Sequence, residues 1–238
     1  MSYNDYPEPD ENSQRFNWPV PRNAYILPWL MIVGMSAIWV QQFAADRIGA
    51  WGVSAKALAA GHYENILLHM AAHGPIVHIA MNMFALYALA PRLLARLGHP
   101  FRGAKAFLLL FVGSGVCGAA LFVVLHPHGT VPMIGASGAL YGLFGALVRL
   151  PVDGTDIVPI DRNHGWRLAK EFVRDNGWLF LMFTVPNLLM GREGGVAWEA
   201  HLGGFLFGLF AAPLFFRSLA SETADTEAPP LASDHPTP

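Results

Sequence analysis

The sequence predicts an all-α polytopic membrane protein with six transmembrane helices. The first reason is composition: the 238 residues are 53% hydrophobic and 13% charged, with a mean hydropathy of +0.36. A soluble domain carries about 25% charged residues. The second reason is that the apolar residues form stretches long enough for a helix to cross about 30 Å of hydrocarbon. A bundle of membrane-spanning helices is the fold class that accommodates both observations.

Six apolar stretches are the predicted spans. They cover residues 24–44, 76–97, 104–125, 133–150, 178–190 and 196–216. The fifth is the weakest, because it is short and contains Pro186, although its helix can begin near Glu171. Residues 45–75 form a long connection with short apolar pieces, and we expect this connection to lie partly in the membrane interface.

The two ends of the chain differ in composition from the spans. Residues 1–23 and 218–238 are polar and contain several prolines, and such segments bury too little apolar surface to fold alone. We therefore expect a flexible tail at 1–23, a membrane domain at 24–217 and a disordered tail at 218–238. The first residues also lack the pattern of a cleaved signal peptide, so insertion is expected to depend on the first span.

The basic residues predict the orientation in the membrane. Six spans place both termini on one side, and all but three of the 15 Lys and Arg residues fall on that side. The exceptions are Arg47, Lys56 and Arg192. Because cytoplasmic loops carry the excess of Lys and Arg, both termini are expected to be cytoplasmic. The compact six-span form suggests a bacterial inner membrane.

Charge and cysteine content exclude several kinds of site. The formal net charge is -2 and the chain has no Lys/Arg-rich run, so we expect no nucleic-acid partner. Cys117 is the single cysteine, which excludes an intrachain disulfide and a thiolate metal cluster. Within its apolar run, Cys117 is expected to be a small buried hydrophobe. We expect neither a cofactor nor a metal ion.

One serine stands among glycines near the start of the fourth predicted span, in the sequence GASGALYG at residues 135–142. Packing fixes a serine hydroxyl near the start of a buried helix, and the free backbone N–H groups beside it can bind negative charge. Ser137 is therefore a candidate nucleophile. The alternative is a surface for close helix packing, because Gly138 and Gly142 are four residues apart.

A histidine at the start of the sixth predicted span is the candidate partner of this serine. His201 shares a helix face with Gly204 and Gly208, and the fourth span offers a matching glycine stripe. Docking of the two stripes would bring the imidazole toward Ser137, where it could take the hydroxyl proton. No Asp or Glu lies in a span interior, and Glu199 points to a different face. We therefore predict a Ser/His dyad.

Two further polar residues share one face of the second predicted span. His78 and Asn82 are four residues apart. Both side chains can donate hydrogen bonds, which a developing oxyanion requires. A polar clamp between helices, worth about 1 kcal/mol, explains the pair equally well.

These motifs together resemble those of the rhomboid intramembrane serine proteases. They occur in the family order on three separate spans: the GASG sequence with Tyr141, the His78/Asn82 pair, and His201 with its following glycines. The likeness covers residues 24–216. It implies a six-helix rhomboid-like bundle in the lipid bilayer that cleaves the transmembrane segments of other membrane proteins.

The resemblance also implies the role of each motif residue. Ser137 would be the nucleophile, and His201 the general base and acid. His78 and Asn82, with the backbone N–H of Ser137, would form the oxyanion hole. Tyr141, one turn after the serine, would stack on His201 or support it.

Other residues are implied to support the site. Gly135 and Gly138 flank the serine and are expected to support its position. His73 resembles a family histidine that lines the water-accessible cavity, and His69 resembles a loop position nearby. With His78, these side chains could admit water from the non-cytoplasmic side.

The first loop and the fifth span raise two further points. Many rhomboids carry a Trp-Arg pair in the first loop, whereas this chain has Glu64 and Asn65 at the corresponding spacing. The anchoring of this loop therefore departs from the family pattern. The fifth span, with Pro186, is a candidate mobile wall through which a substrate enters.

Three other functions are open on this sequence. A membrane metalloprotease has some support because His69 and His73 have the i, i+4 spacing, but the glutamate of a His-Glu-x-x-His motif is absent. A rhomboid-like protein that binds transmembrane clients without cutting them is the main non-enzymatic alternative, although such proteins typically lack the serine or the histidine. A secondary transporter would be expected to show an internal repeat, and none is evident.

Overall fold

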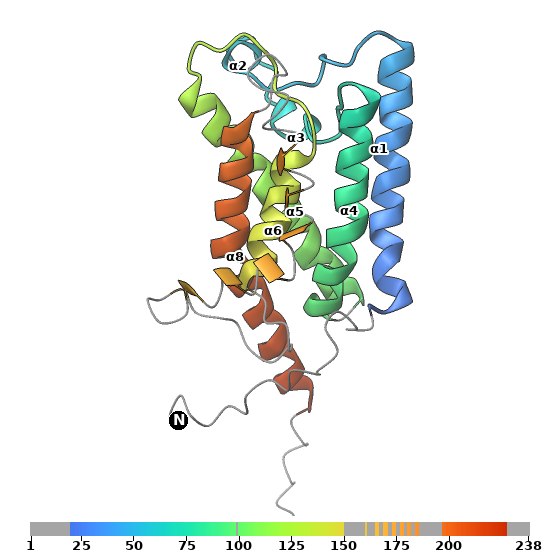
Figure 1. The fold of residues 1–238 in the computed structure, drawn as a ribbon, viewed down its shortest axis with the longest axis vertical. Helices are drawn as coiled ribbons and strands as arrows, with labels where there is room; N and C mark the ends of the chain where they lie inside the picture. The colour runs from blue at the N-terminus through green and yellow to red at the C-terminus, as the bar shows by residue number, and fades with distance from the viewer. Residues whose placement is uncertain are drawn as a thin grey trace, which may run out of the picture.

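The computed structural model describes residues 20–98, 100–149, 160, 165–166, 169–170, 173–174, 177–178, 180–181, 184–185 and 197–227. The regular elements in these residues are helices, and Figure 1 shows them as a bundle. They are η2 (Arg22–Tyr25), α1 (Ile26–Ala44), α2 (Ala55–Ala59), α3 (Asn65–Leu68), α4 (Ile76–Leu97), α5 (Pro100–Leu125), α6 (Ser137–Arg149) and α8 (Trp198–Glu227).

Four of the described helical segments are long and apolar enough to cross a membrane. They are Arg22–Ala44, Ile76–Leu97, Phe101–Leu125 and Trp198–Phe216. The predicted first, second, third and sixth spans correspond to these segments, and the second has the predicted bounds. The predicted fifth span at 178–190 lies mostly outside the described residues, so the count of six spans stays a prediction.

Helix α6 differs from the predicted fourth span in where it begins. We expected the span to start near Met133, but the helix starts at Ser137 and has 13 residues. Met133 instead exchanges two backbone hydrogen bonds with Val53, at 2.9 and 2.8 Å. This pairing holds Met133 in an extended conformation, so the helix cannot begin at that residue.

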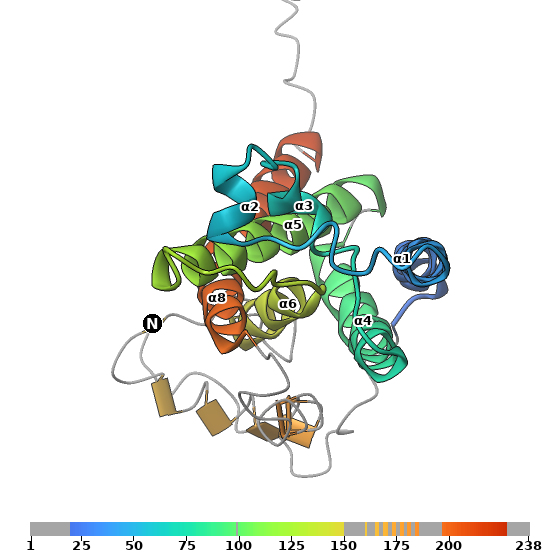
Figure 2. The same ribbon diagram turned by 90° about the horizontal axis from the view of Figure 1, so that it is seen from above.

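Helix α6 lies at the centre of the described bundle. It contacts α8, α5 and α4, and the view from above in Figure 2 places it among these three helices. Every residue from Gly138 to Ala146 is buried. Helix α1 lies at the edge, where it packs mainly on α4 and leaves large apolar side chains such as Leu30 and Val33 exposed. In a membrane this face of α1 would contact lipid.

Glycines bring the backbones of α6 and α8 together. An added Cβ at Gly204 would overlap the carbonyl oxygen of Gly138, and one at Gly208 would overlap that of Gly142. Gly145 is equally close to the carbonyl oxygen of Phe205. Such close approach allows van der Waals contact between backbones, the main source of helix association in lipid. The predicted docking of the two glycine stripes is confirmed.

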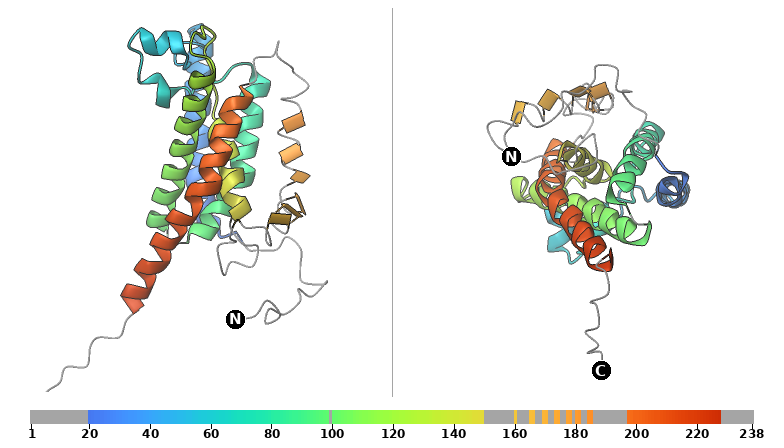
Figure 3. Two further views of the ribbon diagram at one scale, coloured as in Figure 1. Left: turned by 90° about the vertical axis from the view of Figure 1, so that its left-hand side faces the viewer. Right: turned by 90° about the horizontal axis from the view of Figure 1, so that it is seen from below.

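The connection between α1 and α4 covers one end of the bundle. It contains the short helices α2 and α3, which Figures 1 and 3 place at the end opposite the C-terminal extension of α8. Helix α8 continues to Glu227, past the predicted end of the last span at Phe216. Residues 126–129 form a turn, in which the Gly129 N–H donates to the His126 carbonyl at 2.9 Å.

Candidate active site

Ser137 is the first residue of α6, and the two residues before it are fixed by the connection between α1 and α4. The Gly135 N–H donates to the His69 carbonyl at 2.8 Å, and the Ala136 N–H donates to His73 Nε2 at 3.4 Å. Gly135 has a φ of +115°, a conformation that side-chain-bearing residues rarely adopt. The serine therefore follows a constrained loop and sits where the first N–H groups of a helix lack helical partners.

The side chains of Ser137 and His201 are hydrogen-bonding neighbours. His201 Nε2 lies 2.9 Å from Ser137 Oγ, and His201 is buried. The two residues are 64 positions apart in sequence, and the glycine contacts between α6 and α8 bring them together. The predicted juxtaposition of hydroxyl and imidazole is confirmed.

An aromatic ring orients the imidazole of His201. The Tyr141 ring stacks on it with a centroid distance of 4.2 Å and an interplanar angle of 11°. The Tyr141 hydroxyl forms a 2.7 Å hydrogen bond with Thr184 Oγ1, and Phe180 packs edge-on against the Tyr141 ring. The tyrosine is thus held on its far side, and the stacking expected for it is present.

The carboxylate of Glu199, two residues before His201, contacts a different histidine. Its Oε1 lies 3.5 Å from Nε2 of His126, which follows the end of α5. The carboxylate is therefore directed toward α5, as predicted from its position on a different helix face. The candidate site therefore consists of a serine, the histidine that contacts it, and a tyrosine stacked on that histidine.

His78 lies against the loop that precedes the serine. Its Nδ1 accepts a hydrogen bond from the Gly74 N–H at 3.3 Å. An imidazole whose Nδ1 accepts carries its proton on Nε2 when neutral. This Nε2 would lie 2.6 Å from a Cβ added at Gly135. A donor N–H therefore sits beside the loop, and a side chain at position 135 would collide with it.

Asn82 is nearly fully buried one turn along α4. Its Nδ2 donates to the backbone carbonyl of His78 at 2.8 Å, and its Oδ1 is buried with no hydrogen-bond partner. An amide nitrogen has two protons, so the bond to His78 leaves a second donor. The second Nδ2 proton is therefore the group of this side chain that could donate to a negatively charged oxygen.

His69 and His73 are buried structural side chains in the connection. Nδ1 of each lies within hydrogen-bond distance of a backbone carbonyl oxygen, that of Asn65 at 3.1 Å for His69 and that of Ala71 at 3.2 Å for His73. Burial lowers the pKa of His69 to about 4, and burial together with nearby His78 lowers the pKa of His73 to about 4. Both are therefore neutral at physiological pH.

The predicted water-lining role of His73 does not fit its position. Its ring has no exposed surface, and both nitrogens have partners, while neighbouring His78 is partly exposed. Among the described residues, no group of three His, Cys, Asp or Glu side chains could hold a metal.

A family model for the rhomboid domain matches residues 60–218. The chain belongs to the rhomboid family. It is an integral membrane protein with apolar helices, and the three motifs identified in the sequence lie within the matched residues.

Several curated proteins share this similarity. The chain is 27% identical to Rhomboid protease GluP of Bacillus subtilis over 169 residues, which is 70% of this chain and 29% of that protein. It is 30% identical to RHOMBOID-like protein 5 of Arabidopsis thaliana, over 58% of this chain and 39% of that protein. It is also 30% identical to the mitochondrial Rhomboid protein 1 of Saccharomyces cerevisiae, over 58% of this chain and 37% of that protein. The chain thus spans well under half the length of these relatives.

Sequence reasoning missed two contacts in this site. Thr184 lies in the weakest predicted span, and a lone hydroxyl in an apolar run was the signal available for it. The Ala136 N–H contact with His73 joins a loop backbone to a side chain 63 positions away. No local sequence pattern predicts such a contact.

Proposed function

We propose that this rhomboid is an intramembrane serine endopeptidase that cleaves transmembrane segments of other membrane proteins with a Ser137/His201 dyad. The observation that carries the proposal is the 2.9 Å contact between Ser137 Oγ and His201 Nε2 at the partly buried start of α6. Nucleophilic serine catalysis requires a base within this distance of the hydroxyl. The protease named among the relatives supports the same class of reaction.

In the first half-reaction, Ser137 Oγ attacks the carbonyl carbon of the scissile peptide bond. His201 Nε2 takes the hydroxyl proton, and the carbonyl π electrons move to the oxygen. When the tetrahedral intermediate collapses, the C–N bond breaks and His201 returns the proton to the leaving amine. The products are an acyl-enzyme, in which Ser137 carries the amino-terminal part of the substrate, and the released carboxy-terminal part with a new amino group.

In the second half-reaction, water attacks the acyl carbon. His201 takes a proton from this water, and the C–O bond to Ser137 breaks as the proton passes to the serine oxygen. In both halves, the oxyanion would be stabilised by the Nε2–H of His78, the second amide proton of Asn82 and the Ser137 N–H. One such donor is typically worth about 3–4 kcal/mol of transition-state stabilisation.

A transmembrane substrate would reach Ser137 from the bilayer. We propose that the chain around Phe180 and Thr184, in the predicted fifth span, is the wall that moves aside. Its support is the position of these two residues: Thr184 bonds the Tyr141 hydroxyl, and Phe180 packs on Tyr141 and Phe144, beside the serine and histidine. Cross-linking this segment to α4 should then abolish cleavage, and a cross-linked protein that still cleaves would exclude the wall as the entry route.

The decisive experiment uses purified protein in lipid vesicles with a single-span model substrate and, separately, a fluorophosphonate reagent that phosphonylates activated serines. Wild type should cleave the substrate and react with the reagent. Ser137→Ala and His201→Ala should do neither while they retain the wild-type melting temperature. Asn82→Ala should retain reduced cleavage. Cleavage by folded Ser137→Ala would refute the dyad.

The same experiment distinguishes the non-proteolytic alternative. A client-binding rhomboid would co-purify with the intact model substrate, would not cleave it, and would show no Ser137-dependent reaction with the fluorophosphonate. Chelating agents should leave wild-type cleavage unchanged, whereas a metalloprotease would lose it.

A further inference from the structure

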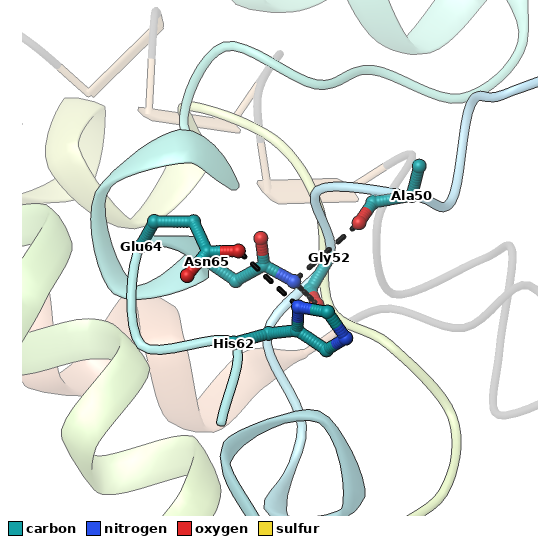
Figure 4. Close-up of polar contacts among 5 residues, drawn as sticks. All are labelled: Ala50, Gly52, His62, Glu64 and Asn65. Atoms are coloured by element: carbon teal, nitrogen blue, oxygen red, sulfur yellow. Dashed lines mark hydrogen bonds and ion pairs between the residues drawn. The ribbon is translucent and has the colours of Figure 1, made fainter. Parts of the chain in front are cut away.

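Asn65 occupies an unusual position in the connection that covers the site. It begins α3 and is 4% exposed. Its side-chain Nδ2 donates to the Gly52 carbonyl at 2.9 Å and reaches the Ala50 carbonyl at 3.4 Å. Figure 4 shows the amide directed at these two backbone oxygens. One buried side chain therefore fixes the turn that precedes Val53.

The turn fixed by Asn65 leads directly to the chain before the serine. Val53, next to Gly52, exchanges both backbone hydrogen bonds with Met133. A Cβ added at Gly52 would overlap Pro132 and lie 3.1 Å from Ile134. The Gly52–Val53 backbone and residues 132–134 are therefore in close contact as well as hydrogen-bonded.

Asn65 also supports a second contact with the same loop. Its backbone carbonyl lies 3.2 Å from the His69 N–H nitrogen, which donates to it, and 3.1 Å from His69 Nδ1. The His69 carbonyl in turn accepts from the Gly135 N–H at 2.8 Å. Two routes thus start at Asn65 and end on residues 133–135, just before Ser137.

We propose that Asn65 is a positioning residue for Ser137, its side chain acting through Gly52–Val53 on the loop at residues 133–135 that its backbone carbonyl also reaches through His69. The proposal rests on the proposed serine protease function. It assigns Asn65 a role in the connection between α1 and α4. Displacement of a catalytic group by about 1 Å can lower a rate by roughly a hundredfold.

The test replaces Asn65 without changing the catalytic residues. Asn65→Ala removes the donor, and Asn65→Asp replaces it with an acceptor of the same shape. Each variant, reconstituted in vesicles with a single-span model substrate, should show kcat lowered by about tenfold or more with KM within twofold of wild type. A purely structural role would lower the melting temperature or the active fraction and leave the kcat of correctly folded, active-site-titrated protein unchanged.

Backbone hydrogen exchange supplies a measurement that does not depend on activity. Peptides covering residues 50–54 and 131–136 should exchange faster in both Asn65 variants, while peptides from α4 should exchange at the wild-type rate. Wild-type exchange in both peptides would overturn the proposal. The exchange measurement tests the role of Asn65 even if the wild-type protein does not cleave the substrate. Absence of cleavage would count against the proposed function alone.

The neighbouring His62–Glu64 pair provides the matched control. Its 3.2 Å contact joins two exposed side chains in the same loop (Figure 4), and Glu64→Gln should leave kcat and backbone hydrogen exchange unchanged.

The two Asn65 variants should behave alike. A lower kcat in Asn65→Asp with a wild-type kcat in Asn65→Ala would mean charge repulsion and would overturn the proposal. If neither variant folds, Gly52→Ala, which must displace Pro132, should lower kcat with KM preserved. A wild-type kcat in Gly52→Ala would then overturn it.

Discussion

The rings of Tyr141 and His201 lie nearly parallel, 4.2 Å apart, so the imidazole that contacts Ser137 is positioned by an aromatic face. Aromatic pairs of this kind contribute about 0.5–1.5 kcal/mol beyond burial. The Glu199 carboxylate, two residues from His201, contacts His126 instead, so within the described residues this stacking supplies the orientation that a third hydrogen-bonding group would otherwise provide.

Replacing the Tyr141 ring should therefore lower the reactivity of Ser137. We expect Tyr141→Leu to reduce the rate of fluorophosphonate labelling by about tenfold, because the loss of roughly 1.4 kcal/mol corresponds to that factor. Tyr141→Phe keeps the stacked ring and should remain within about threefold of wild type. Equal losses in the two variants would show that the hydroxyl, and not the ring, is what matters.

The hydrogen bond between Tyr141 and Thr184 predicts an effect on substrate entry. Thr184→Val preserves shape but removes a contact at 2.7 Å, and hydrogen bonds of this kind in membrane proteins average about 0.6 kcal/mol. If this segment is the moving wall, kcat/KM for the single-span substrate should rise about threefold. Labelling by the small fluorophosphonate should not change.

Val185 supplies the control for that prediction. It is the next residue and is 41% exposed, so Val185→Ala should leave both rates at wild-type values. An unchanged or lower kcat/KM in Thr184→Val would argue that the segment does not limit entry.

The helix spans and the approach of His201 to Ser137 could be predicted from the sequence because both depend on local patterns. Apolar runs gave the bounds of α4, and glycines four residues apart on two helices predicted the approach of His201 to Ser137. The contacts of Asn65 with Gly52 and of Val53 with Met133 have no such periodicity. They join irregular segments far apart in the chain, and only the folded backbone determines which carbonyl faces which donor.

The buried histidine His69 predicts a pH dependence of stability. Its pKa falls from 6.5 to about 4 on folding. Above pH 6.5 His69 is neutral in both the folded and the unfolded state, so it does not lower the free energy of unfolding. Between pH 6.5 and 4 the unfolded chain binds a proton that the folded protein does not, and stability should fall by about 1.4 kcal/mol per pH unit. Below pH 4 this loss levels off.

Thermal unfolding of Ser137→Ala in detergent between pH 7.5 and 5 measures this effect without self-cleavage. The melting temperature should decrease as the pH is lowered, and His69→Gln should reduce the slope. His62→Gln, at an exposed position in the same connection, should retain the full slope. A slope that is the same in His69→Gln and in its Ser137→Ala parent would exclude His69 as a contributor.

The contact between Gly204 and Gly138 predicts that a single methyl group will disturb the dyad. An added Cβ at Gly204 would meet the backbone oxygen of Gly138, which cannot rotate away as a side chain can. Overpacking of this kind costs about 1–3 kcal/mol, and relief requires α8 to move away from α6. Gly204→Ala should therefore lower the melting temperature and slow fluorophosphonate labelling by at least tenfold, because His201 moves with α8. The matched control is Gly34→Ala in α1, because nothing lies within 4 Å of the added Cβ. Alanine is also more favourable than glycine in a helix, by about 1 kcal/mol. Gly34→Ala should label at the wild-type rate with an equal or higher melting temperature. Wild-type labelling by Gly204→Ala would mean that the Ser137–His201 contact does not depend on the close approach of these two helices.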